Sequence, residues 1–156
     1  MKINWKQLLL SIAISLAVGG LSAFLTSDNM RLFEQIQKPP LSPPAILFPI
    51  VWTILYVLMG ISSYLVLRSN GNNDQVGNAL KVYGLQLVFN FFWSLIFFNA
   101  EAYLLSFIWL VIMWVLILVT IRRFYKISKP AGLLMIPLLL WVTFAGYLNL
   151  AIYFLN

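Results

Sequence analysis

The sequence contains no cysteine and no histidine, and only four of its 156 residues are acidic. Without cysteine, neither a disulfide nor a thiolate metal site can form. Without histidine, the usual protein ligand of zinc and haem iron is also missing. The scarcity of carboxylates restricts metal and proton chemistry further. We therefore expect no metal site and no cofactor that the protein requires.

Charge of either sign is scarce as well. Charged residues make up 9% of the chain and hydrophobic residues 62%, with a mean hydropathy of +0.93. Soluble domains carry about a quarter charged residues, so this composition predicts an integral membrane protein with lipid around it. The ten basic residues flank apolar segments and form no single stripe. We read them as topology signals and expect no nucleic-acid partner.

Five apolar segments carry no charge, and each is close to the ~20 residues that a membrane span requires. A span must be a helix, because only a helix satisfies its own backbone in lipid. The predicted fold class is therefore all-α, an integral membrane bundle of five transmembrane helices in one domain, residues 1–156. The five predicted helices cover residues 7–26, 45–67, 82–100, 102–121 and 131–154.

The basic residues are divided unequally between the two ends of such a bundle. Five spans place the termini on opposite sides, with eight basic residues on the side of the N-terminus and two on the other. The positive-inside rule then predicts a cytoplasmic N-terminus and an external C-terminus. The lack of cysteine and of a transit-like N-terminus favours the cell membrane of a bacterium.

Proline is concentrated between the first two predicted spans. Five of the seven prolines lie between Pro39 and Pro49. Each removes a backbone donor and fixes φ, so we expect a stiff loop that leads directly into the second helix. Residues 69–78 are rich in asparagine and glycine, which predicts a second connector. Pro137 is expected to kink the fifth helix.

Two of the predicted helices place amides and indoles on one face. Gln86, Asn90 and Trp93 recur at helical spacing in the third span, and Trp141 and Asn149 do so in the fifth. Amides are costly in hydrocarbon, so they should point inward, to a partner helix, a water or a ligand. Aromatic side chains with a few polar groups are typical of a pocket for a flat, largely apolar molecule.

Small side chains recur every four residues in the first span, at Ser11, Ser15, Gly19 and Ala23. Such a row lets another helix approach closely. The partner is either a helix of the same chain or a second copy in a homodimer.

No span carries a charged residue between its ends, which argues against proton-coupled export and ion conduction. No nucleophile, base and acid set is visible either.

Several motifs resemble those of the tryptophan-rich sensory protein/translocator protein (TspO/MBR) family, in family order and over nearly the whole length. The motifs are Lys38-Pro39-x-x-x-Pro43-Pro44, Phe48-x-x-x-Trp52-x-x-Leu55-Tyr56-x-x-Met59-Gly60, Gln86-Leu87-x-x-Asn90-x-x-Trp93-Ser94-x-x-Phe97-Phe98 and Pro137-x-x-x-Trp141-x-x-Phe144-Ala145-x-x-Leu148-Asn149.

The resemblance implies a five-helix bundle, commonly dimeric, with a pocket beneath the loop between the first two helices. It implies that the pocket binds tetrapyrroles such as protoporphyrin IX. Carried over position by position, the ligand-binding residues would be Pro43, Pro44, Phe48, Trp52, Asn90, Trp93, Trp141, Ala145, Leu148 and Asn149.

Three functions are compatible with that resemblance. The leading hypothesis is a tetrapyrrole-binding membrane protein that acts as a sensor, scavenger or regulator. The second is an enzyme that degrades bound porphyrin with light and oxygen, with Trp52 and Trp141 as its catalytic residues, matching the tryptophans implicated in some bacterial relatives. The third is a passive carrier of porphyrin or lipid, because the sequence offers no residue that would couple transport to an ion.

Overall fold

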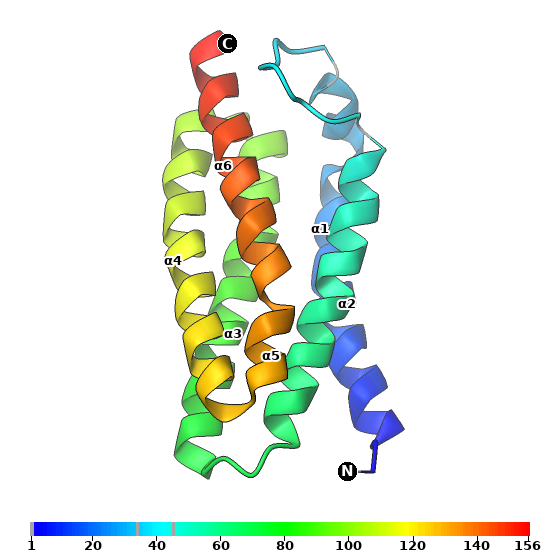
Figure 1. The fold of residues 1–156 in the computed structure, drawn as a ribbon. Helices are drawn as coiled ribbons and strands as arrows, with labels where there is room; N and C mark the ends of the chain where they lie inside the picture. The colour runs from blue at the N-terminus through cyan, green and yellow to red at the C-terminus, as the bar shows by residue number, and fades with distance from the viewer. Residues whose placement is uncertain (1, 34, 45) are drawn as a thin grey trace.

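The computed structural model describes residues 2–33, 35–44 and 46–156, with the backbone alone for residues 30–33. The elements assigned within these ranges are all helices (Figure 1). They are α1 (Trp5–Phe33), α2 (Leu47–Leu67), α3 (Asn73–Ser94), the π-helical η1 (Leu95–Asn99), α4 (Tyr103–Ile127), α5 (Lys129–Leu134) and α6 (Ile136–Leu155).

Five stretches are long and apolar enough to cross a membrane: α1, α2, α3 with η1, α4, and α5 with α6. The prediction of an all-α integral membrane bundle with five transmembrane helices is therefore confirmed. Figure 1 shows the helices running along one axis, with the N- and C-termini at opposite ends. Large apolar side chains such as Leu9, Phe24 and Leu140 are exposed on the outside, as a surface in contact with lipid requires.

Helix α3 begins nine residues before the predicted span, at Asn73 instead of residue 82. The connector that we expected over residues 69–78 is therefore too long, since only residues 68–72 separate α2 from α3. The reason is that Asn72 acts as a helix cap. Its side-chain oxygen accepts a hydrogen bond from the Gln75 N–H at 2.8 Å, which satisfies a donor that the helix start leaves free.

The fifth span is broken into α5 and α6 at Met135, which confirms the expected effect of Pro137. Pro137 lies in the first turn of α6, where a missing backbone donor costs least. The chain closes the preceding turn with a hydrogen bond from the Met135 N–H to the Gly132 carbonyl at 3.2 Å. The break precedes the part of α6 that lines the cavity described below, which begins at Ala145.

The connection from α3 to α4 is a tight hairpin built on the π-helical turn η1. The Ala100 N–H donates to the Leu95 carbonyl at 3.0 Å, five residues back. Glu101 then takes a left-handed backbone conformation with φ of 51°, which reverses the chain. The hairpin holds Phe97 and Phe98 of η1 close to the centre of the bundle.

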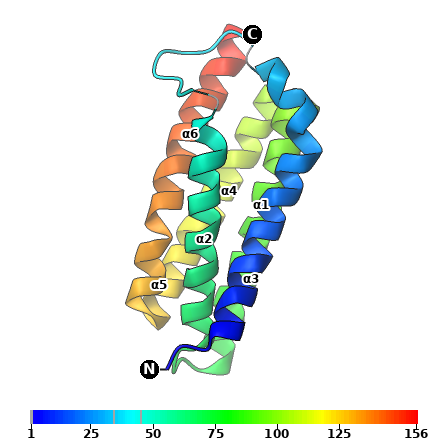
Figure 2. The ribbon, with the colours of Figure 1, turned by 90° about the vertical axis from the view of Figure 1, so that its right-hand side faces the viewer.

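Helices α1 and α2 approach each other closely along the row of small side chains (Figure 2). The Ser15 hydroxyl donates to the Tyr56 carbonyl at 2.6 Å. A Cβ atom added to Gly60 would lie 2.5 Å from the Ile12 Cα, and one added to Gly19 would collide with the Tyr56 ring. Of the two partners considered for this row, the structure shows a helix of the same chain.

The other helices leave space at one end of the bundle. Helix α2 packs against α1 and against the short α5, whereas α6 packs against α4. The upper parts of α2 and α6 are therefore less closely packed than the rest. The loop of residues 35–44, called the proline loop below, lies at that end, beside the C-terminus (Figure 1).

Candidate functional site

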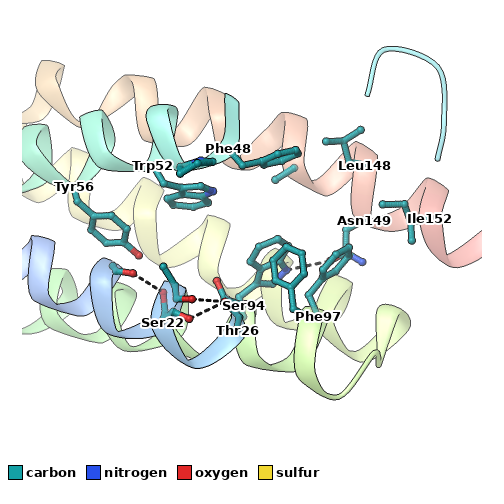
Figure 3. Close-up of a pocket in the computed structure, with 16 residues that line it drawn as sticks. Ser22, Thr26, Phe48, Trp52, Tyr56, Ser94, Phe97, Leu148, Asn149 and Ile152 are labelled. Carbon is teal, nitrogen blue, oxygen red and sulfur yellow. Dashed lines mark hydrogen bonds between the residues drawn. The ribbon is translucent and has the colours of Figure 1, made fainter. Parts of the chain in front are cut away.

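The space between the helices forms a partly open cavity of about 130 Å³, called the main cavity below. Its walls come from α1, α2, α3, η1 and α6, in the half of the bundle that carries the proline loop (Figure 3). The walls are predominantly apolar. The site is therefore a place for an apolar ligand with a few polar substituents.

Aromatic rings form two facing sides of the main cavity. Phe48 and Trp52 come from α2, and Trp93 and Phe97 come from the end of α3 and from η1. The Trp93 and Phe97 rings are stacked, with centroids 5.1 Å apart and an angle of 22° between their planes. Two aromatic sides that face each other suit a flat ring system, because offset stacking is favourable.

Asn149 connects three helices at the wall that α6 contributes. Its Oδ1 accepts hydrogen bonds from Trp93 Nε1 and from the Ser106 hydroxyl, both at 3.1 Å. Its Nδ2 donates to the Tyr103 carbonyl at 2.8 Å. The amide and the Trp93 indole N–H are thus used within the protein, so Trp93 presents the face of its ring to a ligand and no free donor.

The wall from α1 was missed by the sequence analysis as part of a ligand site. It consists of Gly19, Ser22, Ala23 and Thr26. The two hydroxyls bond to carbonyls of their own helix, Ser22 to Gly19 at 3.0 Å and Thr26 to Ser22 at 2.8 Å. This side of the cavity is therefore flat and effectively apolar. Gly19 and Ala23 belong to the row of small residues. That row was the sequence feature from which this wall could have been predicted.

Two hydroxyls in the main cavity remain available for a ligand. Tyr56 and Ser94 both line it. Among the residues that the structure describes, neither of these two hydroxyls has a hydrogen-bond partner. Figure 3 shows the Tyr56 ring directed into the space between α2 and α1. These groups lie in the interior half of the cavity, away from the proline loop.

The structure brings six of the ten predicted residues together around the main cavity: Phe48, Trp52, Trp93, Ala145, Leu148 and Asn149. Pro43 and Pro44 lie in the proline loop and do not line the cavity. Asn90 is buried one turn away from Trp93, and its Nδ2 donates to Gln86 Oε1 at 2.8 Å. That bond lies within α3, and Gln86 Nε2 in turn reaches the neighbouring helix α2 at Met59 Sδ, at 3.5 Å.

Trp141 lies on the outer side of the same wall. It lines a groove between α2 and α6 that is separate from the main cavity, together with residues such as Leu58 and Leu140. Its ring packs edge to face against Phe48, with centroids 5.8 Å apart. Phe48 thus has the cavity on one side and Trp141 on the other. The two tryptophans proposed as catalytic, Trp52 and Trp141, do not line the same space.

Comparison with known proteins shows similarity over nearly the whole chain. The model of the TspO/MBR family matches residues 11–155. The chain is 38% identical over 155 residues to a tryptophan-rich protein TspO of Chlorobaculum tepidum, which covers 97% of this chain and 98% of that protein. It is 32% identical over 149 residues to the tryptophan-rich sensory protein of Cereibacter sphaeroides, covering 96% and 90%. It is 31% identical over 133 residues to the translocator protein of Homo sapiens, covering 85% and 79%.

Proposed function

The chain belongs to the TspO/MBR family, and on that premise we propose that it binds tetrapyrroles such as protoporphyrin IX in the main cavity. It would act as a membrane sensor, scavenger or regulator of these molecules. The observation that carries the proposal is the pair of aromatic sides, Phe48 and Trp52 facing Trp93 and Phe97, in a cavity with apolar walls. A flat, apolar ring with polar substituents matches that chemistry.

The size of the main cavity sets a condition on binding. At about 130 Å³ it is smaller than the ~300–1,000 Å³ of typical ligand pockets. A tetrapyrrole therefore fits only after side chains and the proline loop move. The loop is the part best suited to move, because it has no regular secondary structure and is tied to Tyr147 and Asn156 by hydrogen bonds at Gln37 and Pro40.

The positions of the free hydroxyls suggest how the ligand would be oriented. Tyr56 and Ser94 lie in the interior half of the cavity, where they could bond to the ring nitrogens or to a small polar group. Charged propionates would stay at the end with the proline loop, because burying a carboxylate without a partner is costly. The ring would then enter edge first from the loop end.

A filled cavity provides the test of this function. Ala145 is buried in the wall from α6, so Ala145→Phe places a ring in the space that the ligand would take. Ala17→Phe makes the same change on the exposed outer face of α1 and is the matched control. We expect Ala145→Phe to lower protoporphyrin IX affinity at least ten-fold in detergent, measured by tryptophan fluorescence quenching, and the control to leave it unchanged. Equal affinities in both variants would rule out this cavity.

Light-dependent breakdown of the bound porphyrin is the second candidate, and Trp52 is the observation in its favour. The Trp52 ring lines the main cavity, so an indole would be in contact with an excited porphyrin. Trp141 would be separated from the ligand by Phe48. The activity would then need Trp52 and would not need direct contact with Trp141, which distinguishes it from the mechanism expected from the resemblance.

We further propose that the chain lies in the cell membrane of a bacterium with its N-terminus in the cytoplasm. The end of the bundle that carries the N-terminus holds eight basic residues and one acidic residue, Asp74. The basic residues are Lys2, Lys6, Arg68, Lys81, Arg122, Arg123, Lys126 and Lys129. The positive-inside rule places this end in the cytoplasm and the main cavity near the opposite surface. Accessibility of a cysteine introduced at exposed Asn70 to a membrane-impermeant thiol reagent in intact cells tests this orientation.

A further inference from the structure

A second site lies at the opposite end of the bundle from the main cavity, between the start of α3 and the end of α4 (Figure 1). It is a depression of about 220 Å³ lined by Gln75, Asn78, Arg123, Lys126 and Ile127. We propose that it binds the phosphate headgroup of an anionic membrane lipid. This inference does not depend on the function proposed for the main cavity.

The two basic side chains of the depression lack a negative partner. The Arg123 guanidinium donates one hydrogen bond, to the Asn78 carbonyl at 3.2 Å, which fixes its direction and leaves other N–H groups free. Neither Arg123 nor Lys126 forms an ion pair within the described residues. A guanidinium and an ammonium beside two amides form a set of donors that matches the oxygens of a phosphate.

The surrounding charge favours an anion as well. The start of α3 contributes the positive end of its helix dipole at Gln75, which opposes the negative end that α4 contributes at Ile127. Lys81 and Arg122 lie on the same two helices but do not line the depression, and Asp74 is the one acidic residue among residues 72–81 and 121–129. The two basic side chains, Arg123 and Lys126, therefore set the sign of the field, and an anion at the depression would experience a net positive charge.

Depth in the membrane identifies the source of the phosphate. Residues 103–121 of α4 carry no charge and span roughly 28 Å at 1.5 Å per residue, close to the ~30 Å of the hydrocarbon core. The next turns, which hold Arg123 and Lys126, therefore lie at the level of the lipid headgroups. Ile127 adds an apolar surface for the glycerol and the first methylenes. Basic pockets between transmembrane helices at this level bind anionic headgroups.

The experiment measures retention of phosphatidylglycerol by the full chain in a neutral detergent, using native mass spectrometry. The pocket variant is Arg123→Gln with Lys126→Gln, and the matched control is Arg122→Gln with Lys129→Gln, which removes the same charges outside the depression. We expect the pocket variant to bind phosphatidylglycerol at least about ten-fold more weakly than the control. Phosphatidylcholine, which has no net charge, should bind weakly to both.

Two further measurements, on the variant Asn78→Asp and with added inorganic phosphate, distinguish a lipid site from a diffuse positive surface and from a site for a free anion. Asn78→Asp retains both basic residues but adds a carboxylate to the depression, so it should also weaken phosphatidylglycerol binding, even if the double variant proves unstable. Equal loss in the pocket variant and the control would mean a diffuse positive surface and would overturn the site. Displacement of phosphatidylglycerol by millimolar inorganic phosphate would assign the site to a free anion and would overturn the lipid as its ligand.

Discussion

Gln37 and Asn156 are 119 positions apart in the sequence and bond to each other twice. The Gln37 N–H donates to Asn156 Oδ1 at 3.1 Å, and Asn156 Nδ2 donates back to the Gln37 carbonyl at 2.8 Å. A further tie joins the Tyr147 hydroxyl to the Pro40 carbonyl at 2.8 Å. Hydrogen bonds at Gln37 and Pro40 thus hold the proline loop to the C-terminal end of the chain, at the loop end of the main cavity.

Loss of the Asn156 side chain should make the main cavity easier to enter. Each hydrogen bond contributes about 0.5–1.5 kcal/mol, so losing both in Asn156→Ala should raise the association and dissociation rates of protoporphyrin IX by roughly five- to 150-fold. Stopped-flow quenching of tryptophan fluorescence measures both rates. Asn73→Ala, which removes an exposed amide at the other end of the bundle, is the control. Unchanged rates in Asn156→Ala would mean that the loop does not limit entry.

Asn149 should be important for stability, independently of any ligand. Asn149→Ala leaves the Trp93 indole N–H, the Ser106 hydroxyl and the Tyr103 carbonyl without this partner. Hydrogen bonds between transmembrane helices contribute about 0.6–1.7 kcal/mol each, so we expect a loss of about 2–4 kcal/mol. Reversible unfolding in SDS measures the change. Asn70→Ala, in the exposed turn after α2, should cost less than about 0.5 kcal/mol.

The contact between α1 and α2 should tolerate no additional methyl group at Gly60. Gly60→Ala would bring a Cβ to 2.5 Å from the Ile12 Cα, which is backbone and cannot move alone. Overpacking of this kind costs about 1–3 kcal/mol or more. Gly20→Ala has open space around the new atom, so it should be neutral or stabilise α1. Thermal unfolding of both variants in one detergent checks the contrast, and equal shifts would contradict the packing described.

Light-dependent loss of porphyrin absorbance should separate the two tryptophans on α2 and α6. Trp52 lines the main cavity, whereas Trp141 lies behind Phe48. If the protein accelerates the loss, Trp52→Phe should remove the acceleration, and Trp141→Phe should retain most of it at matched occupancy. A requirement for Trp141 alone would mean that the porphyrin binds in the outer groove between α2 and α6.

The fold followed from the sequence because membrane spans are encoded locally. An uncharged apolar run of sufficient length must be helical in lipid, whatever its neighbours are. Helix ends were predicted less well. Asn72 was read as part of a flexible connector, but the same side chain that favours a turn also caps a helix, and only the partner at Gln75 decides between them.

The site was only partly predictable, because a shared helix face gives no information on which neighbour covers it. Trp93 and Asn149 were placed on inward faces, and the structure brings them within hydrogen-bond distance. Trp141 occupies an equivalent position on its own helix but faces α2 from outside, since α6 diverges from α2 after the break at Met135. The contribution of Ser22 and Thr26 depends on where α1 packs, which no local pattern encodes.

The close contact between α1 and α2 also affects how the affinity of a ligand for the main cavity should be expressed. With Gly60 against Ile12, that side of the bundle is closed to a molecule dissolved in the bilayer. On the side between α2 and α6, the rings of Phe48 and Trp141 pack edge to face beside the cavity. Apolar molecules concentrate in lipid, so the proposed tetrapyrrole would reach the loop end of the cavity mainly from the bilayer. Its dissociation constant would then be meaningful as a mole fraction of lipid, and a value per litre of buffer would change with the amount of membrane.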